Sequence, residues 1–297
     1  MDHTPLFLES EFAQRPAEDA AFHIIPVPYE HTVSYGAGTA RGPAAILEAS
    51  NQLEVFDGTG CPGEEGFHTY PAVDCGGGPE TVFPRIMTAV GEAMHHGVPL
   101  VLGGEHSITA PAVEAVQQAV GAPVGVIQFD AHADLRDEYE GSRRSHACVA
   151  RRLHGDLGTP LVQIGVRALS PEEIVYRSTV ANDPSAPVIV AHDAAVLVPE
   201  GITEIVLPEG FPELVYVTID VDGLDPSVIP ATGTPVPGGI GWYQFLSLLT
   251  SIAAQRRIIA ADVVELAPIA GQPAWDYAAA EIVHRTIGII ARSRSAS

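Results

Sequence analysis

The sequence contains no lysine, so all 15 of its basic residues are arginine. Enzymes that form Schiff bases, enzymes that use pyridoxal phosphate and P-loop nucleotide hydrolases all depend on a lysine nitrogen. The absence of lysine excludes these three classes. It also means that no lysine ammonium is available to neutralise a cluster of buried carboxylates.

Cysteine is scarce as well. Cys61, Cys75 and Cys148 are the only cysteines, and no two of them form a Cys-x-x-Cys pair. An odd number of cysteines at such spacings favours free thiols in a reducing compartment over a disulfide framework or a zinc–thiolate site.

Long hydrophobic runs and targeting patterns are also missing. No stretch approaches the ~20 apolar residues of a membrane span, and residues 1–20 lack the basic and apolar regions of a signal peptide. The formal net charge of -22 argues against nucleic-acid and anionic-membrane partners, and it is compatible with a cationic substrate. We therefore expect a cytoplasmic protein.

Apolar residues make up 46% of the 297 residues, which is enough for a sizeable core. Apolar runs of strand length alternate with segments of helical periodicity, and the runs are apolar on both faces. This pattern predicts one α/β domain over residues 1–297, a three-layer α/β/α sandwich around a mainly parallel sheet. The predicted strands are 22–27, 99–102, 124–129, 161–166, 188–191, 214–219 and 258–264. The predicted helices are 44–54, 108–120, 241–257 and 274–291.

Polar residues follow three of these runs in patterns that suit metal binding. Two of the segments alternate polar and apolar residues. If strand geometry continues through them, their polar side chains project to one face about 7 Å apart. Because ligands bind outside the carboxyl ends of parallel strands, we expect the side chains to meet at one edge of the sheet. The six candidate ligands are His106, Asp130, His132, Asp134, Asp220 and Asp222.

Each motif taken alone has a second reading. The segment 130–134 could be a hydrogen-bonding cluster, His106 a buried histidine bonded to the backbone, and the segment 220–222 a turn. Together they favour metal, because burying several unpaired carboxylates costs several kcal/mol each. Oxygen-dominated ligation with two imidazoles and no thiolate favours Mn²⁺ over structural Zn²⁺ or Mg²⁺. Two such ions can lower the pKa of a shared water, which predicts a metallohydrolase.

Five segments occur in this order along the chain: GGEHS, DAHADLRDEYEG, SHACVARR, IDVDGLDPSVIPATGTPVPGG and DVVELAP. They resemble the ureohydrolases, the superfamily of arginases and agmatinases. The resemblance extends from about Gly103 to Pro268, and a segment near the N-terminus, SYGAGTARGPAAIL, is similar to agmatinases. It implies an arginase-like fold, two Mn²⁺ ions per subunit and a homo-oligomer, either a trimer or a hexamer.

The resemblance also implies how the ligands are shared, with Asp130 and Asp220 as bridges between the metals. The implied ligands of one metal are His106, Asp130, Asp134 and Asp220. The implied ligands of the other are His132, Asp130, Asp220 and Asp222.

Further residues carry over from the family pattern. His146 matches a flexible histidine that passes a proton to the departing amine, and Glu265 matches the carboxylate that binds the guanidinium of the substrate. Asp134 could also orient the nucleophile. Asp262 is the weaker candidate for guanidinium binding, because it lies three residues before Glu265 and projects from the other face of its strand.

The implied reaction is hydrolysis of a guanidino group to urea and a primary amine. Arginases recognise the α-carboxylate and α-amine of arginine through an asparagine- and serine-rich stretch. Residues 135–144 contain no asparagine, and they resemble the corresponding agmatinase segment instead. We therefore expect agmatine as substrate, with putrescine as product and a role in polyamine biosynthesis. The complete set of ligands argues against a non-catalytic metal-binding relative.

The charged residues beyond the ligands do not decide which group the substrate carries at the end away from its guanidinium. The acids Asp137, Glu138 and Glu140 would suit a substrate with a cation at each end, or they pair with arginines of their own loop. The loop arginines could instead bind a carboxylate, which keeps 4-guanidinobutyrate-type acids and formimidoylglutamate open. These arginines are Arg136, Arg143 and Arg144.

Overall fold

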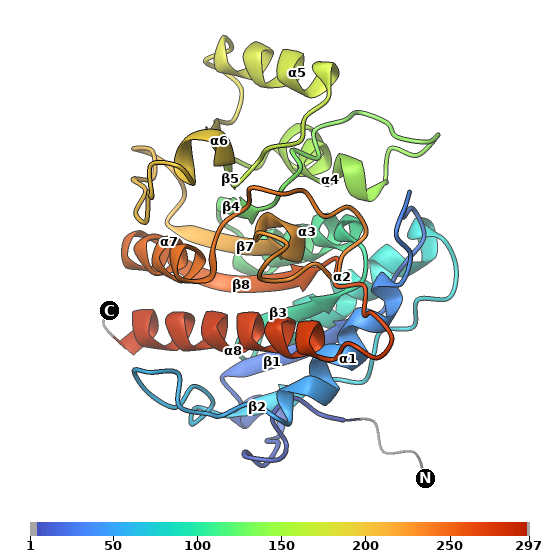
Figure 1. The fold of residues 1–297 in the computed structure, drawn as a ribbon, viewed down its shortest axis with the longest axis vertical. Coiled ribbons are helices and arrows are strands. Elements are labelled where there is room, and N and C mark those ends of the chain that lie inside the picture. Colours follow the sequence, from blue (N-terminus) through green and yellow to red (C-terminus); the bar gives the residue numbers. More distant parts are fainter. Residues whose placement is uncertain (1–4, 296–297) are drawn as a thin grey trace.

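Eight strands form a single sheet in the computed structural model, which describes residues 5–295. Every strand pairing is parallel, and the order is β2-β1-β3-β8-β7-β4-β5-β6. The predicted parallel sheet is thus confirmed (Figure 1). The strands are β1 (Phe22–Val27), β2 (Phe67–Thr69), β3 (Val98–Gly103), β4 (Val124–Phe129), β5 (Leu161–Ile164), β6 (Ile189–His192), β7 (Leu214–Asp220) and β8 (Arg257–Val264).

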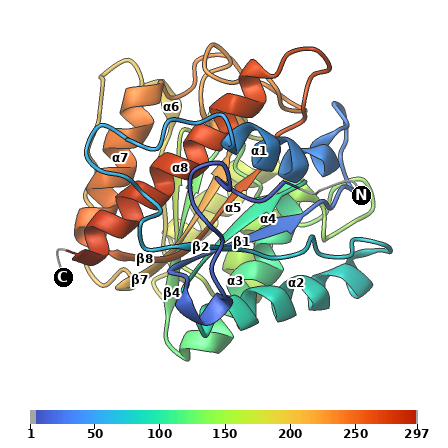
Figure 2. The ribbon, with the colours of Figure 1, turned by 90° about the horizontal axis from the view of Figure 1, so that it is seen from below.

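Helices cover both faces of this sheet and complete the predicted three-layer sandwich. One core cluster joins the sheet to α1, α7 and α8, and a second joins it to α2, α3 and α4, so the two sets lie on opposite faces (Figure 2). The helices are α1 (Gly42–Ser50), α2 (Pro79–Met94), α3 (Thr109–Val120), α4 (Val149–Arg151), α5 (Pro171–Ala181), α6 (Ala194–Leu197), α7 (Trp242–Gln255) and α8 (Ala274–Ser295).

The elements that the sequence analysis did not predict include β2, α5 and α2. Strand β2 has three residues, with His68 at its centre. Helix α5 lies beyond the β5–β6 end of the sheet (Figure 1), and among its residues only Glu173 and Val180 are buried. The start of this helix nevertheless has a sequence signal, because Ser170 and Glu173 form a capping box. Helix α2 begins at a proline and contains Pro84, which weakens its helical pattern.

The strand order decides which loops meet. Strands β3, β8, β7 and β4 are consecutive neighbours in the middle of the sheet, and all run in the same direction. The loops after their carboxyl ends therefore converge over one central edge. The part of the chain that the structure describes contains no helix both long and apolar enough to cross a membrane.

Candidate metal centre

The six candidate ligands lie at the carboxyl ends of three of these central strands. His106 follows β3 in a short 3-10 turn, Asp130 comes directly after β4, and Asp220 is the last residue of β7. The fourth strand, β8, lies between β3 and β7 and is followed by Glu265. Four segments that are far apart in the sequence thus meet at one place.

The expected strand-like alternation of ligands is wrong beyond the strand ends. Asp134 lies after β4 with a φ of 52°, a left-handed conformation that turns the chain back. Asp222 lies in a 3-10 turn, where its backbone N–H donates to Oδ1 of Asp220 (2.9 Å). A continued strand would hold alternate side chains about 7 Å apart, too far to share one ion. The turns bring them closer than a strand would.

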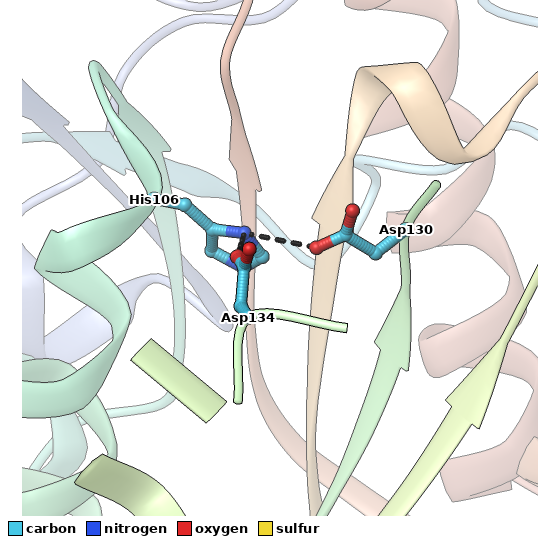
Figure 3. Close-up of side chains that lie close together, drawn as sticks. All are labelled: His106, Asp130 and Asp134. Carbon is cyan, nitrogen blue, oxygen red and sulfur yellow. Dashed lines mark ion pairs between the residues drawn. The ribbon is translucent and has the colours of Figure 1, made fainter. Parts of the chain in front are cut away.

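Three carboxylates surround the imidazole of His106. Its Nδ1 lies 3.2 Å from Oδ2 of Asp130, 3.2 Å from Oδ2 of Asp134 and 3.4 Å from Oδ2 of Asp220. Figure 3 shows the side chains of Asp130 and Asp134 pointing at this ring from different directions. All four side chains are almost fully buried. They correspond to the ligand set that the resemblance implies for one metal.

A second group adjoins the first. Nδ1 of His132 lies 3.0 Å from Oδ2 of Asp222 and 3.7 Å from Oδ1 of Asp130. Asp130 therefore has one carboxylate oxygen in each group. The ligand atoms of His106, Asp130 and Asp134 lie close enough together to hold a metal ion, and so do those of Asp130, His132 and Asp222. Asp220 contacts the ring of His106. Among the described residues, it reaches the second group only through the backbone N–H of Asp222, which is not a metal ligand. Its bridging role stays a prediction.

The chemistry of His106 fits a metal ion. Its Nε2 lies 2.9 Å from Oγ1 of Thr218, whereas its buried Nδ1 has no hydrogen-bond partner. If Nε2 carries the proton and donates it to Thr218, the lone pair of Nδ1 faces three carboxylates. This arrangement is repulsive unless a cation lies between them. An outer hydrogen bond that orients the ring in this way is typical of histidine ligands.

The carboxylates show the same need for positive charge. Burial, followed by the charge of Asp130, raises the pKa of Asp134 to about 7. Burial also raises the pKa of Asp220 well above its usual range, and the charges of Asp222 and Asp130 add to this effect. Bound divalent ions would relieve both effects. Because the donors are oxygens and imidazole nitrogens with no thiolate, they fit a metal such as Mn²⁺.

We expect the affinity for Mn²⁺ to rise with pH. Burial lowers the pKa of His132, but hydrogen bonds to Asp130 and Asp222 outweigh this and raise it to about 12 in the absence of metal. An incoming ion must displace that proton, so its Kd should fall by up to about tenfold per pH unit for each proton displaced. Calorimetric titration in buffers of different ionisation enthalpy measures the Kd and the number of protons displaced. An affinity that does not change between about pH 6 and about pH 8 would contradict this linkage.

Polar residues that the sequence analysis did not single out support the ligands. Nε2 of Gln128 donates to Oδ2 of Asp130 (2.7 Å), and Gln163 in turn donates to Gln128 (2.7 Å). Both Gln128 and Thr218 precede a ligand by two residues inside an otherwise apolar strand. A lone polar side chain at this position of a buried strand is the signal that could have identified them.

Arg167 holds the second ligand loop without contacting a carboxylate. Its guanidinium donates to the backbone carbonyls of Asp222 (2.6 Å), Gly223 (3.3 Å) and Leu224 (3.3 Å). Burial lowers the pKa of this guanidinium, but the arginine stays charged. The guanidinium is held by backbone carbonyls and forms no ion pair with a carboxylate of the described residues, although its charge acts on Asp222 and Asp130 from a distance.

Both ligand groups border a cavity of about 160 Å³, and Glu265 and His146 line it too. Glu265 has a φ of 64°, and its Oε1 accepts the backbone N–H of His106 (2.6 Å). Its Oε2 accepts no hydrogen bond from the residues that the structure describes. Burial raises the pKa of this carboxyl to about 8. One oxygen of Glu265 is thus anchored, and the other is available to a ligand.

Asp262, the weaker sequence candidate, lies behind the site. Its Oδ2 accepts hydrogen bonds from the hydroxyls of Thr109 (2.7 Å) and Tyr216 (2.8 Å), and it does not line the cavity. Thr109 also contacts Thr218, the partner of His106. Asp262 therefore belongs to the polar network that supports the His106 ring.

The charged residues of the loop over residues 135–144 have different environments, because some form ion pairs and others are exposed. Asp137 accepts from Arg152 (2.5 Å) and pairs with Arg143 (3.2 Å), while Arg144 pairs with Glu80 (3.4 Å). The reading in which loop acids pair with nearby arginines therefore holds for Asp137. Glu138 and Glu140 are exposed, and neither lines the cavity.

Arg136 is the exception in this loop, because it lines the cavity. Its guanidinium lies over the ring of Tyr139, 5.0 Å from the centroid, and no carboxylate of residues 5–295 pairs with it.

The three cysteines are free thiols, as predicted.

The family model named Arginase family matches residues 20–288, which include every candidate ligand. The chain belongs to the arginase family. Among curated relatives, the N(1)-aminopropylagmatine ureohydrolase of a Synechocystis strain is 37% identical over 291 residues, covering 95% of this chain and 92% of the relative. The agmatinase of Pyrococcus horikoshii is 31% identical over 283 residues, covering 93% and 94%.

Solved structures of the arginase family share the fold. The agmatine ureohydrolase of Thermoplasma volcanium superposes with a TM-score of 0.78 at 27% identity, covering 97% of this chain and 98% of that one. The arginase of Medicago truncatula gives 0.76 at 29% identity, with coverage of 92% and 88%. The predicted arginase-like fold is confirmed, and the chain is an arginase-family ureohydrolase with His and Asp groups placed to bind metal.

Proposed function

We propose that this ureohydrolase uses two Mn²⁺ ions to hydrolyse agmatine to urea and putrescine. The observation that carries the proposal is the Glu265 carboxylate, which has one oxygen anchored on His106 and the other free in the cavity beside both ligand groups. A planar guanidinium offers paired N–H donors to such a carboxylate. The cytoplasmic location and the trimeric or hexameric assembly stay predictions from the sequence.

The residues of the cavity divide the reaction between them. When bound, the metals would supply a water of lowered pKa as nucleophile. Glu265 holds the guanidinium so that its central carbon faces the ligand groups, and Asp134 orients the attacking water. The bond from that carbon to the alkyl nitrogen breaks, and His146 passes a proton to the departing amine. Burial lowers the pKa of His146, which eases the release of this proton.

The choice of a guanidino amine rests on the relatives and on charge. Two relatives that align over nearly the whole chain are named for agmatine or N(1)-aminopropylagmatine, both of which carry amines. A formal net charge of -22 also attracts cations at long range. N(1)-aminopropylagmatine, which shares the guanidino end, is the closest variant of the proposed substrate.

A guanidino acid of the 4-guanidinobutyrate type is the second candidate, because Arg136 lines the cavity without a carboxylate partner. An arginine in that position would pair with the carboxylate of such a substrate and repel the ammonium of agmatine. Its stacking on Tyr139 offers another role, which is to hold the mouth of the cavity in shape.

Urea release from agmatine, N(1)-aminopropylagmatine, 4-guanidinobutyrate and arginine tests the proposal. With Mn²⁺-loaded protein, we expect kcat/KM to be at least about tenfold higher for agmatine than for 4-guanidinobutyrate, and chelator-treated protein to be inactive. Urea from none of the four compounds would contradict the proposed function. Faster hydrolysis of 4-guanidinobutyrate would favour the second candidate instead.

The Arg136→Gln variant separates the two substrate classes. For a guanidino amine, removing a like charge should leave kcat unchanged and lower KM by about threefold. For a guanidino acid, losing the ion pair should raise KM by about tenfold or more. Arg143→Gln is the matched control, because this arginine of the same loop pairs with Asp137 and does not line the cavity. A rise in KM for agmatine in Arg136→Gln alone would count against the proposed substrate.

A further inference from the structure

A buried carboxylate next to the first ligand organises the loop that faces it. Glu105 is fully buried and accepts the backbone N–H groups of His31 and Thr32 on Oε2, each at 2.6 Å. Its Oε1 accepts the hydroxyls of Thr32 (2.7 Å) and Ser107 (2.5 Å). Three of these four donors belong to His31 and Thr32, so they attach the start of the loop over residues 31–36 to the segment that carries His106.

The hydroxyl of Thr32 joins this carboxylate to His146. Oγ1 of Thr32 accepts the backbone N–H of His146 (3.0 Å) and lies 3.3 Å from Nδ1 of its ring. A hydroxyl has one proton and two lone pairs. Since the proton is donated to Glu105, Thr32 can only accept at the ring, and the proton of a neutral His146 ring must then be on Nδ1.

We propose that Thr32, held by Glu105, is a positioning residue that fixes the orientation and the tautomer of His146. With the proton kept on Nδ1, the lone pair of a neutral ring is on Nε2. The ring lines the cavity, and the backbone carbonyl of Thr32 lies near it as a further hydrogen-bond acceptor. Nε2 is therefore the atom that takes up a proton and passes it to the departing amine. This inference rests on the proton-transfer role given to His146 in the proposed function.

Ser145 offers a competing contact. Its Oγ lies 3.5 Å from Nδ1 of His146, at the outer limit of a hydrogen bond, whereas Thr32 is closer and also holds the backbone of His146. If Ser145 donated to Nδ1, the ring proton would be on Nε2. The two arrangements predict opposite tautomers and can be told apart by mutation.

Two substitutions at residue 32 isolate the hydroxyl. Thr32→Val keeps the shape of the side chain and the backbone N–H to Glu105, but it removes the hydroxyl. Thr32→Ser keeps the hydroxyl. Ser145→Ala is the control within the same pair of contacts. None of these side chains belongs to the ligand groups, so we expect the metal content to stay close to that of the wild type. Because Glu105 loses one donor in Thr32→Val, the melting temperature of this variant should fall by about 2–4 °C.

The kinetic test uses Mn²⁺-loaded full-length protein and agmatine. We expect Thr32→Val to lower kcat by about 10- to 100-fold, part of what general acid–base catalysis contributes, while KM changes by less than about twofold. Thr32→Ser should recover kcat to within about threefold of wild type, and Ser145→Ala should retain it. A wild-type kcat in Thr32→Val, or an equal loss in Ser145→Ala, would overturn the proposal.

A spectroscopic test does not depend on turnover. The ¹⁵N shifts of labelled histidine, recorded on full-length protein with diamagnetic Zn²⁺ in place of Mn²⁺ and assigned through His146→Asn, report which ring nitrogen carries the proton. We expect Nδ1–H at His146 in wild type and Thr32→Ser, and its loss in Thr32→Val. An Nε2–H tautomer in the wild type refutes the positioning role even if urea is released. The expected tautomer without urea release from any guanidino compound would refute only the proposed function.

Discussion

Asp130→Asn is expected to lower kcat by at least about 1,000-fold and to reduce the bound metal. Asp130 has one oxygen near His106 and the other near His132, so a single substitution disturbs both ligand groups. An asparagine keeps only one acceptor oxygen. Its amide nitrogen would also face a donor, because Oδ2 of Asp130 accepts from Gln128 and Oδ1 from the backbone N–H of His132. Metal analysis by mass spectrometry and urea release measure the two losses.

The control for this variant is Asp137→Asn, which removes a carboxylate of the same loop that pairs with arginines outside the ligand groups. It should keep its metal and its activity. Full activity with two metals in Asp130→Asn would refute the bridging assignment. Asp220→Asn is expected to abolish turnover as well, and its metal content reports whether Asp220 contributes to one ion or to both.

Glu265→Gln is expected to lower kcat/KM for agmatine by about 100- to 1,000-fold while metal content stays unchanged. Because Oε1 accepts the backbone N–H of His106, the glutamine oxygen would keep that place and turn its NH₂ group toward the cavity. Two sets of N–H donors would then face each other when a guanidinium binds. Steady-state kinetics and metal analysis test this expectation, and loss of metal would show that Glu265 contributes to the metal site instead.

The pH dependence of substrate binding follows from the same carboxyl. A carboxyl whose pKa is raised to about 8 is largely neutral below that pH and charged above it. The Kd of the metal-free protein for a guanidinium should therefore fall as pH rises toward 8 in the wild type, and this slope should be absent in Glu265→Gln. Glu138→Gln, a neutralised carboxylate that is exposed and outside the cavity, should keep the wild-type slope.

Much of the sheet could be predicted because buried parallel strands are continuous apolar runs. All seven predicted strands are present with ends shifted by at most two residues, as in β5, which ends at Ile164 where the prediction ran to 166. The three-residue β2 and the exposed helix α5 were not predicted. Both lack the apolar periodicity that burial imposes, and they are stabilised by neighbours and by a capping box.

The charged loop shows where sequence spacing stops being informative. Asp137 and Arg136 are adjacent, and the sequence allowed either of them to contact the substrate. In the structure Asp137 pairs with Arg143 and Arg152, and Arg136 borders the cavity. Which of two neighbouring long side chains faces a cavity depends on the path of the loop, and that path depends on residues distant in the chain.

The sequence by itself determined the kind of chemistry. The absence of lysine, the excess of carboxylates after apolar runs, and the two imidazoles among them require a cation, because ionised carboxylates cannot be buried together without one. Tertiary structure decided which side chains lie close enough together to share one. The strand order places β3, β7 and β4 close together, and left-handed or 3-10 turns then aim side chains that strand spacing would have kept apart. The support of His146 by Thr32 and Glu105 also needed the folded chain, because hydrogen bonds between residues 32, 105 and 146 leave no periodic mark in a sequence.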